Sequence, residues 1–297
     1  MSLFDQLVDQ ALQNQQALAP LRLVVEKELL QRDILRELSS AGLLAGLTFM
    51  GGTCLRACYG SARLSEDLNF TGGANFSRES LGAVANTLVR SLHAKYGLRI
   101  EVSEPLRETG NVDTWKLKVQ TRPGQSSMPA QRINIDVCAI PSYEPRPMLL
   151  LNPYGVDMGT SGLIVQAQSR AEIFTDKLVA FALRPNRIKN RDLWDMAWLH
   201  QEAVKPQLGL LASKLQDHQC STARYTELLT QRCHMLAQQS PLALDFRQEM
   251  RRFLPAQTVQ QTVDLPAFWE FITQLMQDLR AQVLRAIAGE HSAGFYM

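Results

Sequence analysis

Asp67 and Asn69 stand two residues apart in a short apolar segment that follows a Gly51-Gly52 pair. If this segment is a strand, Leu68 and Phe70 face one side and the two oxygen-bearing side chains face the other. Oxygen ligands on one face suit a divalent cation, and paired glycines let the backbone come close to a ligand. The pattern therefore predicts a cation held over bound phosphates.

A further acid, Asp136, lies within the apolar segment 132–140. Alternation places Ile133, Ile135 and Val137 on one face and Asp136 on the other. An unpaired carboxylate is costly to bury. On this pattern alone, Asp136 is either a metal ligand or an acid at a strand end that is paired with an arginine.

A second group of charges falls within the 24 residues from Glu172 to Asp195. Dense positive charge of this kind can neutralise a triphosphate and the pyrophosphate that leaves it. Asp192 and Asp195 are three apart and share one face of a helix. The alternative is an ordinary pair of charged helices tied by salt bridges. The residues of this group are Glu172, Lys177, Arg184, Arg187, Lys189, Arg191, Asp192 and Asp195.

The first group resembles the signature of nucleotidyltransferases of the polymerase-beta type, a glycine turn followed by an Asp-x-Asp strand. More narrowly, both groups together resemble the AbiEii/AbiGii toxin family, which includes the MenT-like toxins. Two positions depart from that family, which usually has Asp at Asn69 and often has Lys at Met50. The residues that carry the resemblance are Gly51-Gly52-Thr53, Tyr59-Gly60, Arg63, Ser65-Glu66-Asp67-Leu68, Phe70, Glu172, Lys177-Leu178 and Lys189-x-Arg191-Asp192-x-x-Asp195.

The resemblance implies a bilobed α+β fold. Its N-lobe, residues 1–145, would hold a mixed nucleotidyltransferase sheet flanked by helices. Its C-lobe, residues 146–297, would be mostly helical and complete the active-site cleft. The implied ligands are Mg²⁺ (or Mn²⁺) and a nucleoside triphosphate (NTP).

The resemblance also implies a role for each site residue. The metal ligands would be Asp67, Asn69 and Asp136. The nucleotide-binding residues would be Gly51, Gly52, Thr53, Arg63, Ser65, Lys177, Arg187 and Arg191. The catalytic set would be Asp67, Lys177, Asp192 and Asp195, with Asp192 or Asp195 acting as a general base or holding Lys177.

The expected activity is transfer of a nucleoside monophosphate to an acceptor, which the resemblance suggests is the 3′ end of tRNA. Blocked aminoacylation would make the chain a growth-arresting toxin of a toxin-antitoxin (abortive infection) system with a cognate antitoxin. Two alternatives remain. Because Asn69 brings no charge, the chain could bind nucleotide without turnover, or the acceptor could be a protein hydroxyl.

Composition limits the remaining possibilities. The net charge is only +2, so any RNA must bind at a local basic patch. No apolar run has membrane-spanning length and no signal peptide is evident, so we expect a cytoplasmic protein without a membrane partner. The five cysteines form no C-x-x-C pair, so a disulfide framework is not expected. Zinc ligation near Cys220 and Cys233 is less favoured than plain structural roles.

Periodicity and turn residues predict the other elements. The Glu26-Lys27-Glu28 segment is either a family motif or a solvated turn of an amphipathic helix. The helical half after Pro206 would pack against the site and offer a surface to nucleic acid or antitoxin. We expect helices within 4–42 and at 53–59, 77–96, 171–183, from 190, 206–217, 221–238, 241–253 and 266–289; strands at 47–50, 65–70, 98–102, 112–121, 132–140 and 163–168; and an irregular connection at 141–162.

Overall fold

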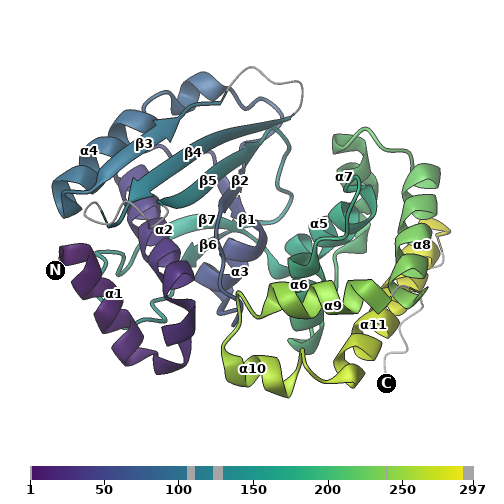
Figure 1. Ribbon diagram of the computed structural model, residues 1–297. Coiled ribbons are helices and arrows are strands. Elements are labelled where there is room, and N and C mark those ends of the chain that lie inside the picture. Colours follow the sequence, from purple (N-terminus) through teal and green to yellow (C-terminus); the bar gives the residue numbers. More distant parts are fainter. Residues whose placement is uncertain (1, 106–110, 123–129, 239, 290–297) are drawn as a thin grey trace, which may run out of the picture. The chain divides into compact units, whose positions relative to one another are not determined.

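The computed structural model describes residues 2–105, 111–122, 130–238 and 240–289 (Figure 1). Turn-forming residues such as Pro and Gly also predict loops at 105–110 and 122–129, which lie largely outside these residues. The chain forms two compact units. The first unit is Met1–Ser169 with Phe253–Pro255, and the second is Arg170–Arg252 with Ala256–Met297.

The first unit is built on a seven-stranded mixed sheet in the order β3-β4-β5-β2-β1-β7-β6 (Figure 1). β2 runs parallel to β5 and antiparallel to β1, so the glycine turn and the acid-bearing strands come together in the middle of the sheet. The strands are β1 (Thr48–Met50), β2 (Leu68–Thr71), β3 (Arg99–Ser103), β4 (Val112–Gln120), β5 (Gln131–Cys138), β6 (Pro145–Leu149) and β7 (Ile164–Gln168).

Helices α2 and α4 cover one face of this sheet. They contact each other, and α2 packs on β5 while α4 packs on β3. The sheet has its own apolar layer, where the rings of Phe49 and Phe70 lie 5.2 Å apart on neighbouring strands. The helices of this unit are α1 (Leu3–Asn14), η1 (Gln16–Leu21), α2 (Arg22–Ser40), α3 (Gly51–Tyr59), η2 (Arg78–Leu81) and α4 (Val84–Tyr96).

The second unit is helical in the part that the structure describes. α5 packs on α6 and α8, and α8 packs on α11. Trp194 of α6 and Phe268 of α11 bring their rings within 5.7 Å. No helix among the described residues is long and apolar enough to cross a membrane. The helices are α5 (Arg170–Leu183), α6 (Asn190–Gln201), η3 (Leu208–Leu210), α7 (Leu211–Asp217), α8 (Thr222–Gln238), α9 (Ser240–Met250), α10 (Ala256–Gln261) and α11 (Pro266–Ile287).

Most predicted elements are confirmed, and four expectations are corrected. The segment 141–162 is not only a connection, because it contains strand β6, which pairs with β7. For that reason the chain divides after Ser169 and not after residue 145. The helix expected at 77–96 is interrupted between η2 and α4. α10 was not expected.

Candidate active site

Asp67, Asn69 and Asp136 occupy one face of the sheet in the first unit. Asn69 and Asp136 are register partners on the parallel strands β2 and β5. Asp67 comes directly before β2, and its Oδ1 accepts a hydrogen bond from the backbone N–H of Asn134 at 3.1 Å. Thr114 of β4 donates its hydroxyl to Asp136 Oδ1 at 2.7 Å. The sheet therefore gathers two carboxylates and one amide from distant parts of the chain.

This donor set fits one divalent cation with a preference for oxygen. All three side chains offer oxygen, which Mg²⁺ and Mn²⁺ prefer. Among the described residues no group of three or more His, Cys, Asp and Glu side chains is arranged to hold a metal. That is consistent with a site of only two acids, since the third donor, Asn69, is an amide.

The glycine turn lies against Asn69. Gly51 begins α3 with a φ of +76°, a conformation that side chains rarely adopt. A Cβ added there would lie 3.7 Å from the Cβ of Asn69. The first turn of α3 therefore begins beside the Asn69 amide, and its backbone N–H groups suit an anion.

Thr53, Ser65 and Arg63 are buried beside this turn. The Thr53 hydroxyl donates to the Asp67 carbonyl oxygen and shares a hydrogen bond with the Ser65 hydroxyl. Arg63 donates to the carbonyl oxygen of Leu64. In this structure the two hydroxyls tie α3 to the segment that carries Asp67.

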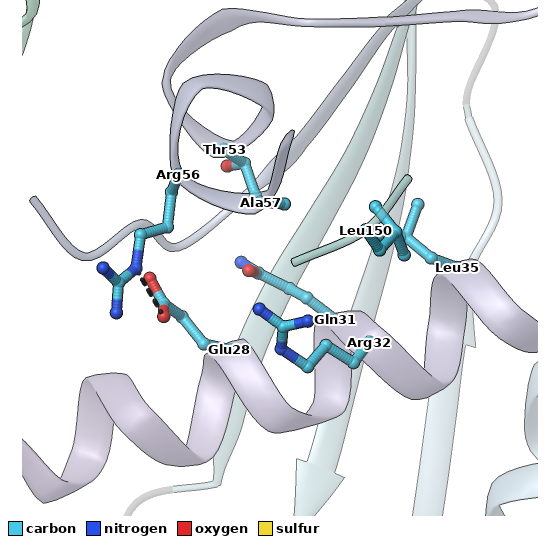
Figure 2. A pocket seen from close by; sticks show the side chains of 8 residues that line it. All are labelled: Glu28, Gln31, Arg32, Leu35, Thr53, Arg56, Ala57 and Leu150. Atoms are coloured by element: carbon cyan, nitrogen blue, oxygen red, sulfur yellow. Dashed lines mark hydrogen bonds and ion pairs between the residues drawn. The ribbon is translucent and has the colours of Figure 1, made fainter. Parts of the chain in front are cut away.

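Glu28 of α2 contacts both α3 and the segment that carries Asp67. Figure 2 shows its carboxylate beside Arg56 of α3. It is 3 % exposed, so the alternative of a solvated turn is wrong here. Its carboxylate accepts hydrogen bonds from the Ser65 backbone N–H at 2.9 Å, from Arg56 Nε at 3.1 Å and from the Tyr154 hydroxyl. One buried acid therefore joins α2, α3 and the segment before β2.

The pocket drawn in Figure 2 is part of this buried network and not a substrate site. Its volume is about 10 Å³, roughly that of one water molecule. Arg32 and Arg56 lie over the Tyr154 ring, at 5.9 and 5.8 Å from its centroid. Burial, followed by the charge of Glu28, raises the pKa of Tyr154 well above its usual value, so the phenol stays protonated and donates to Glu28.

We expect Glu28→Gln to lower the free energy of unfolding by about 3 kcal/mol, because it leaves the Arg56 guanidinium buried without its counter-charge. Urea unfolding would measure the loss. The control is Glu37→Gln, which removes the more exposed pair with Arg36 and should cost less than about 1 kcal/mol. Equal stability of the two variants would contradict the proposed anchoring role of Glu28.

The second unit brings Lys177, Asp192 and Asp195 together. Lys177 Nζ lies 2.9 Å from Asp192 Oδ1 and 2.7 Å from Asp195 Oδ2. Lys177 is 6 % exposed and Asp195 is fully buried. Arg184 reaches the other oxygen of Asp192 at 3.2 Å. The two carboxylates therefore hold the Lys177 ammonium in one position on α5.

Asp192 is a poor proton acceptor in this cluster. Burial alone would raise its pKa, but Lys177, Lys189 and Arg184 outweigh burial and hold the pKa well below its usual value. A carboxylate whose pKa is so low has little tendency to accept a proton, so its contact with Lys177 favours a role in holding that ammonium over a role as general base.

The remaining charges of this segment lie in different surroundings. Glu172 accepts from Lys214 of α7 at 2.8 Å. Arg191 pairs with Glu249 of α9 at 3.2 Å. Arg187 is exposed in the connection between α5 and α6. Several ion pairs within the second unit therefore hold Glu172, Lys177, Arg184, Arg191, Asp192 and Asp195.

On one mixed sheet, a glycine turn lies beside a central strand that Asp67 directly precedes, and the neighbouring strand carries Asp136. This arrangement defines a nucleotidyltransferase. The model of the family described as "Nucleotidyl transferase AbiEii toxin, Type IV TA system" matches residues 33–274. The chain therefore belongs to the AbiEii family of nucleotidyltransferase toxins, which act in type IV toxin-antitoxin systems.

Solved structures agree with this fold. MenT4, a nucleotidyltransferase toxin from Mycobacterium tuberculosis H37Rv, is similar with a TM-score of 0.53 and 15 % identity, over 96 % of this chain and 99 % of that one. JHP933 from Helicobacter pylori is similar with a TM-score of 0.51 and 16 % identity, over 90 % of this chain and 95 % of that one. A search of curated proteins found no match.

Proposed function

We propose that this toxin transfers a nucleoside monophosphate from an NTP to the 3′ end of tRNA, with Mg²⁺ as the metal, and thereby blocks translation. The observation that supports this most strongly is the pairing of Asn69 with Asp136 on adjacent parallel strands. Asp67 lies on the same face, and Gly51 lies beside the Asn69 side chain. Family membership supports a toxin and an accompanying antitoxin. The tRNA acceptor is proposed from the resemblance to the MenT-like toxins.

In the proposed reaction an acceptor hydroxyl oxygen forms a bond to the α-phosphorus of the NTP. The bond between that phosphorus and the oxygen that bridges it to the β-phosphorus breaks. Pyrophosphate leaves with that oxygen, and the hydroxyl proton is released. Asp67, Asn69 and Asp136 would hold the cation, which supplies positive charge to the triphosphate. The N–H groups at the start of α3 would bind phosphate oxygens, with Gly51 keeping the approach open.

The second unit contributes positive charge in this proposal. The Lys177 ammonium would interact with the nucleotide phosphates, and Arg187 and Arg191 would add guanidinium donors for phosphate oxygens. Asp192 and Asp195 would keep Lys177 in one orientation, so that little reorganisation is needed when the nucleotide arrives.

The test is transfer of labelled nucleotide. Purified chain is incubated with total tRNA, Mg²⁺ and each of the four labelled triphosphates, beside Asp67→Ala and Lys177→Ala. Labelled tRNA that is absent with both variants supports the proposal and identifies the preferred base. Labelling of protein and not of RNA would replace tRNA by a protein hydroxyl as the acceptor. Labelling of neither would contradict the proposed transfer.

A second candidate function is nucleotide binding without turnover, and Asn69 is the observation that favours it. An amide supplies an oxygen ligand but no negative charge, so the site holds its cation with two carboxylates. Intact binding of NTP and Mg²⁺ without transfer to any RNA or protein would support this candidate.

We expect Asn69→Asp to strengthen Mg²⁺ binding by about tenfold, because it adds a charged ligand next to Asp67 and Asp136. Without Mg²⁺ the new charge repels its neighbours, so thermal unfolding should become more dependent on Mg²⁺ than in the native chain. The control is Asn86→Asp, which adds the same charge on the exposed side of α4. The metal assignment would be contradicted by an equal Mg²⁺ response in the two variants.

A further inference from the structure

Lys189 differs from Lys177, Arg184 and Arg191 because, among the described residues, no carboxylate lies within ion-pair distance of its ammonium. Lys177 contacts Asp192 and Asp195, Arg184 contacts Asp192, and Arg191 contacts Glu249. Lys189 forms no hydrogen bond or ion pair through its ammonium with any residue that the structure describes. It is nevertheless half-buried in the same cluster.

The surroundings of Lys189 disfavour its charge. It is the N-cap residue of α6, the end at which the helix dipole favours an anion and opposes a cation. Burial lowers the pKa of Lys189 to about 8. Asp192 opposes this shift, while the neighbouring charges of Arg191, Lys177 and Arg184 add to it. The attraction of Asp192 therefore does not offset burial and the neighbouring cations, and an added anion would stabilise the ammonium.

Another buried lysine of the same unit shows the usual solution. Lys214 is 3 % exposed and lies 2.8 Å from Glu172 and 2.5 Å from Asp176. Although burial opposes the shift, these two carboxylates raise the pKa of Lys214. The helices can thus supply close partners for a buried lysine, whereas Asp192 attracts Lys189 without forming an ion pair with it.

We propose that the Lys189 ammonium binds a phosphate oxygen of the nucleoside triphosphate and is the anion-binding cation that this cluster leaves open. In this arrangement Lys177 is oriented by its two carboxylates, and the ligand gives Lys189 the close counter-charge that Asp192 does not provide. The inference rests on the proposed function and specifies how the second unit recognises triphosphate.

Binding of inorganic triphosphate with Mg²⁺, a probe without a base, tests this directly by calorimetry. We expect Lys189→Met to weaken binding by about tenfold or more. In the native chain, affinity should fall about tenfold from pH 7 to pH 9, because the free lysine loses its proton near pH 8 and the bound one keeps it. Lys189→Arg should bind without this pH dependence, because a guanidinium stays charged.

The melting temperature of Lys189→Met distinguishes a ligand-binding role from a structural one. Loss of a lysine that stabilises the fold would lower the melting temperature, whereas loss of an ammonium that is kept for a ligand would raise it. An unfolded chain binds more protons than the folded one between pH 8 and the ordinary lysine pKa, so the charged Lys189 destabilises the native state at neutral pH. We therefore expect Lys189→Met to raise the melting temperature at pH 7 by a few degrees. Lys214→Met, which leaves two carboxylates without their cation, should lower it.

The outcomes separate this inference from the proposed function. If the native chain transfers nucleotide while Lys189→Met binds triphosphate as tightly as the native chain, the inference fails and the proposed function stands. A lower melting temperature for Lys189→Met, with pH-independent binding by the native chain, would also overturn the inference. If the native chain neither transfers nucleotide nor binds triphosphate, both proposals fall.

Discussion

Asp67→Asn should lower nucleotide transfer by about 10²- to 10³-fold while the chain stays folded. The substitution keeps an oxygen that can accept the N–H of Asn134, which Asp67 Oδ1 now accepts at 3.1 Å. It removes one of the two negative charges in the proposed donor set, so the cation would be held by Asp136 and two amides. Transfer of labelled nucleotide would give the loss, and urea unfolding would show an unchanged fold.

Asp113→Asn is the matched control for this substitution. Asp113 lies on β4 in the same sheet, but it pairs with Arg78 and is partly exposed. Its replacement should leave transfer unchanged and cost less than about 1 kcal/mol in stability. Transfer by Asp67→Asn within a few-fold of the native rate would remove Asp67 from the proposed metal site.

The local pattern of the first unit was sufficient to predict much of its sheet. Alternation correctly placed Leu68 and Phe70 in the core and Asp67 and Asn69 on the opposite face. The same alternation correctly placed Ile133, Ile135 and Val137 of β5 in the core and Asp136 on the opposite face. What alternation could not supply was register, because the pairing of Asn69 with Asp136 depends on how distant strands align.

Two features escaped prediction for physical reasons. β6 contains Pro145 and Pro147, residues typical of turns, and such residues are tolerated here because β6 is the edge strand of the sheet. Glu28 follows the charged residues Glu26 and Lys27, so its sequence environment suggests an exposed helix face. Its burial depends on Arg56 and Tyr154, and no local pattern connects these residues. The apolar neighbours Leu29 and Leu30 were the only local signal of burial.

Lys177→Met should both destabilise the second unit and abolish transfer. It leaves Asp192 and Asp195 buried without their shared cation, which we expect to cost about 3–5 kcal/mol of unfolding free energy. The depressed pKa of Asp192 stabilises the native fold above the ordinary aspartate pKa, and this stability is lost as the pH falls through the lower, folded value. Without Lys177 the carboxylates protonate at higher pH, although Arg184 and Lys189 still face Asp192. The difference in unfolding free energy between the native chain and Lys177→Met, measured by urea unfolding, should therefore be larger at pH 8 than at pH 5.

Lys214→Met separates the two effects of the Lys177 substitution. Lys214 is an equally buried lysine between two carboxylates, Glu172 and Asp176, so its loss should destabilise the chain by a similar amount. It lies outside the proposed nucleotide-binding set, so the folded fraction of Lys214→Met should transfer nucleotide at the native rate. If the two variants lose transfer in proportion to their loss of stability, Lys177 acts only as a structural cation. If Lys177→Met alone loses transfer at temperatures where both variants are folded, its ammonium acts on the nucleotide.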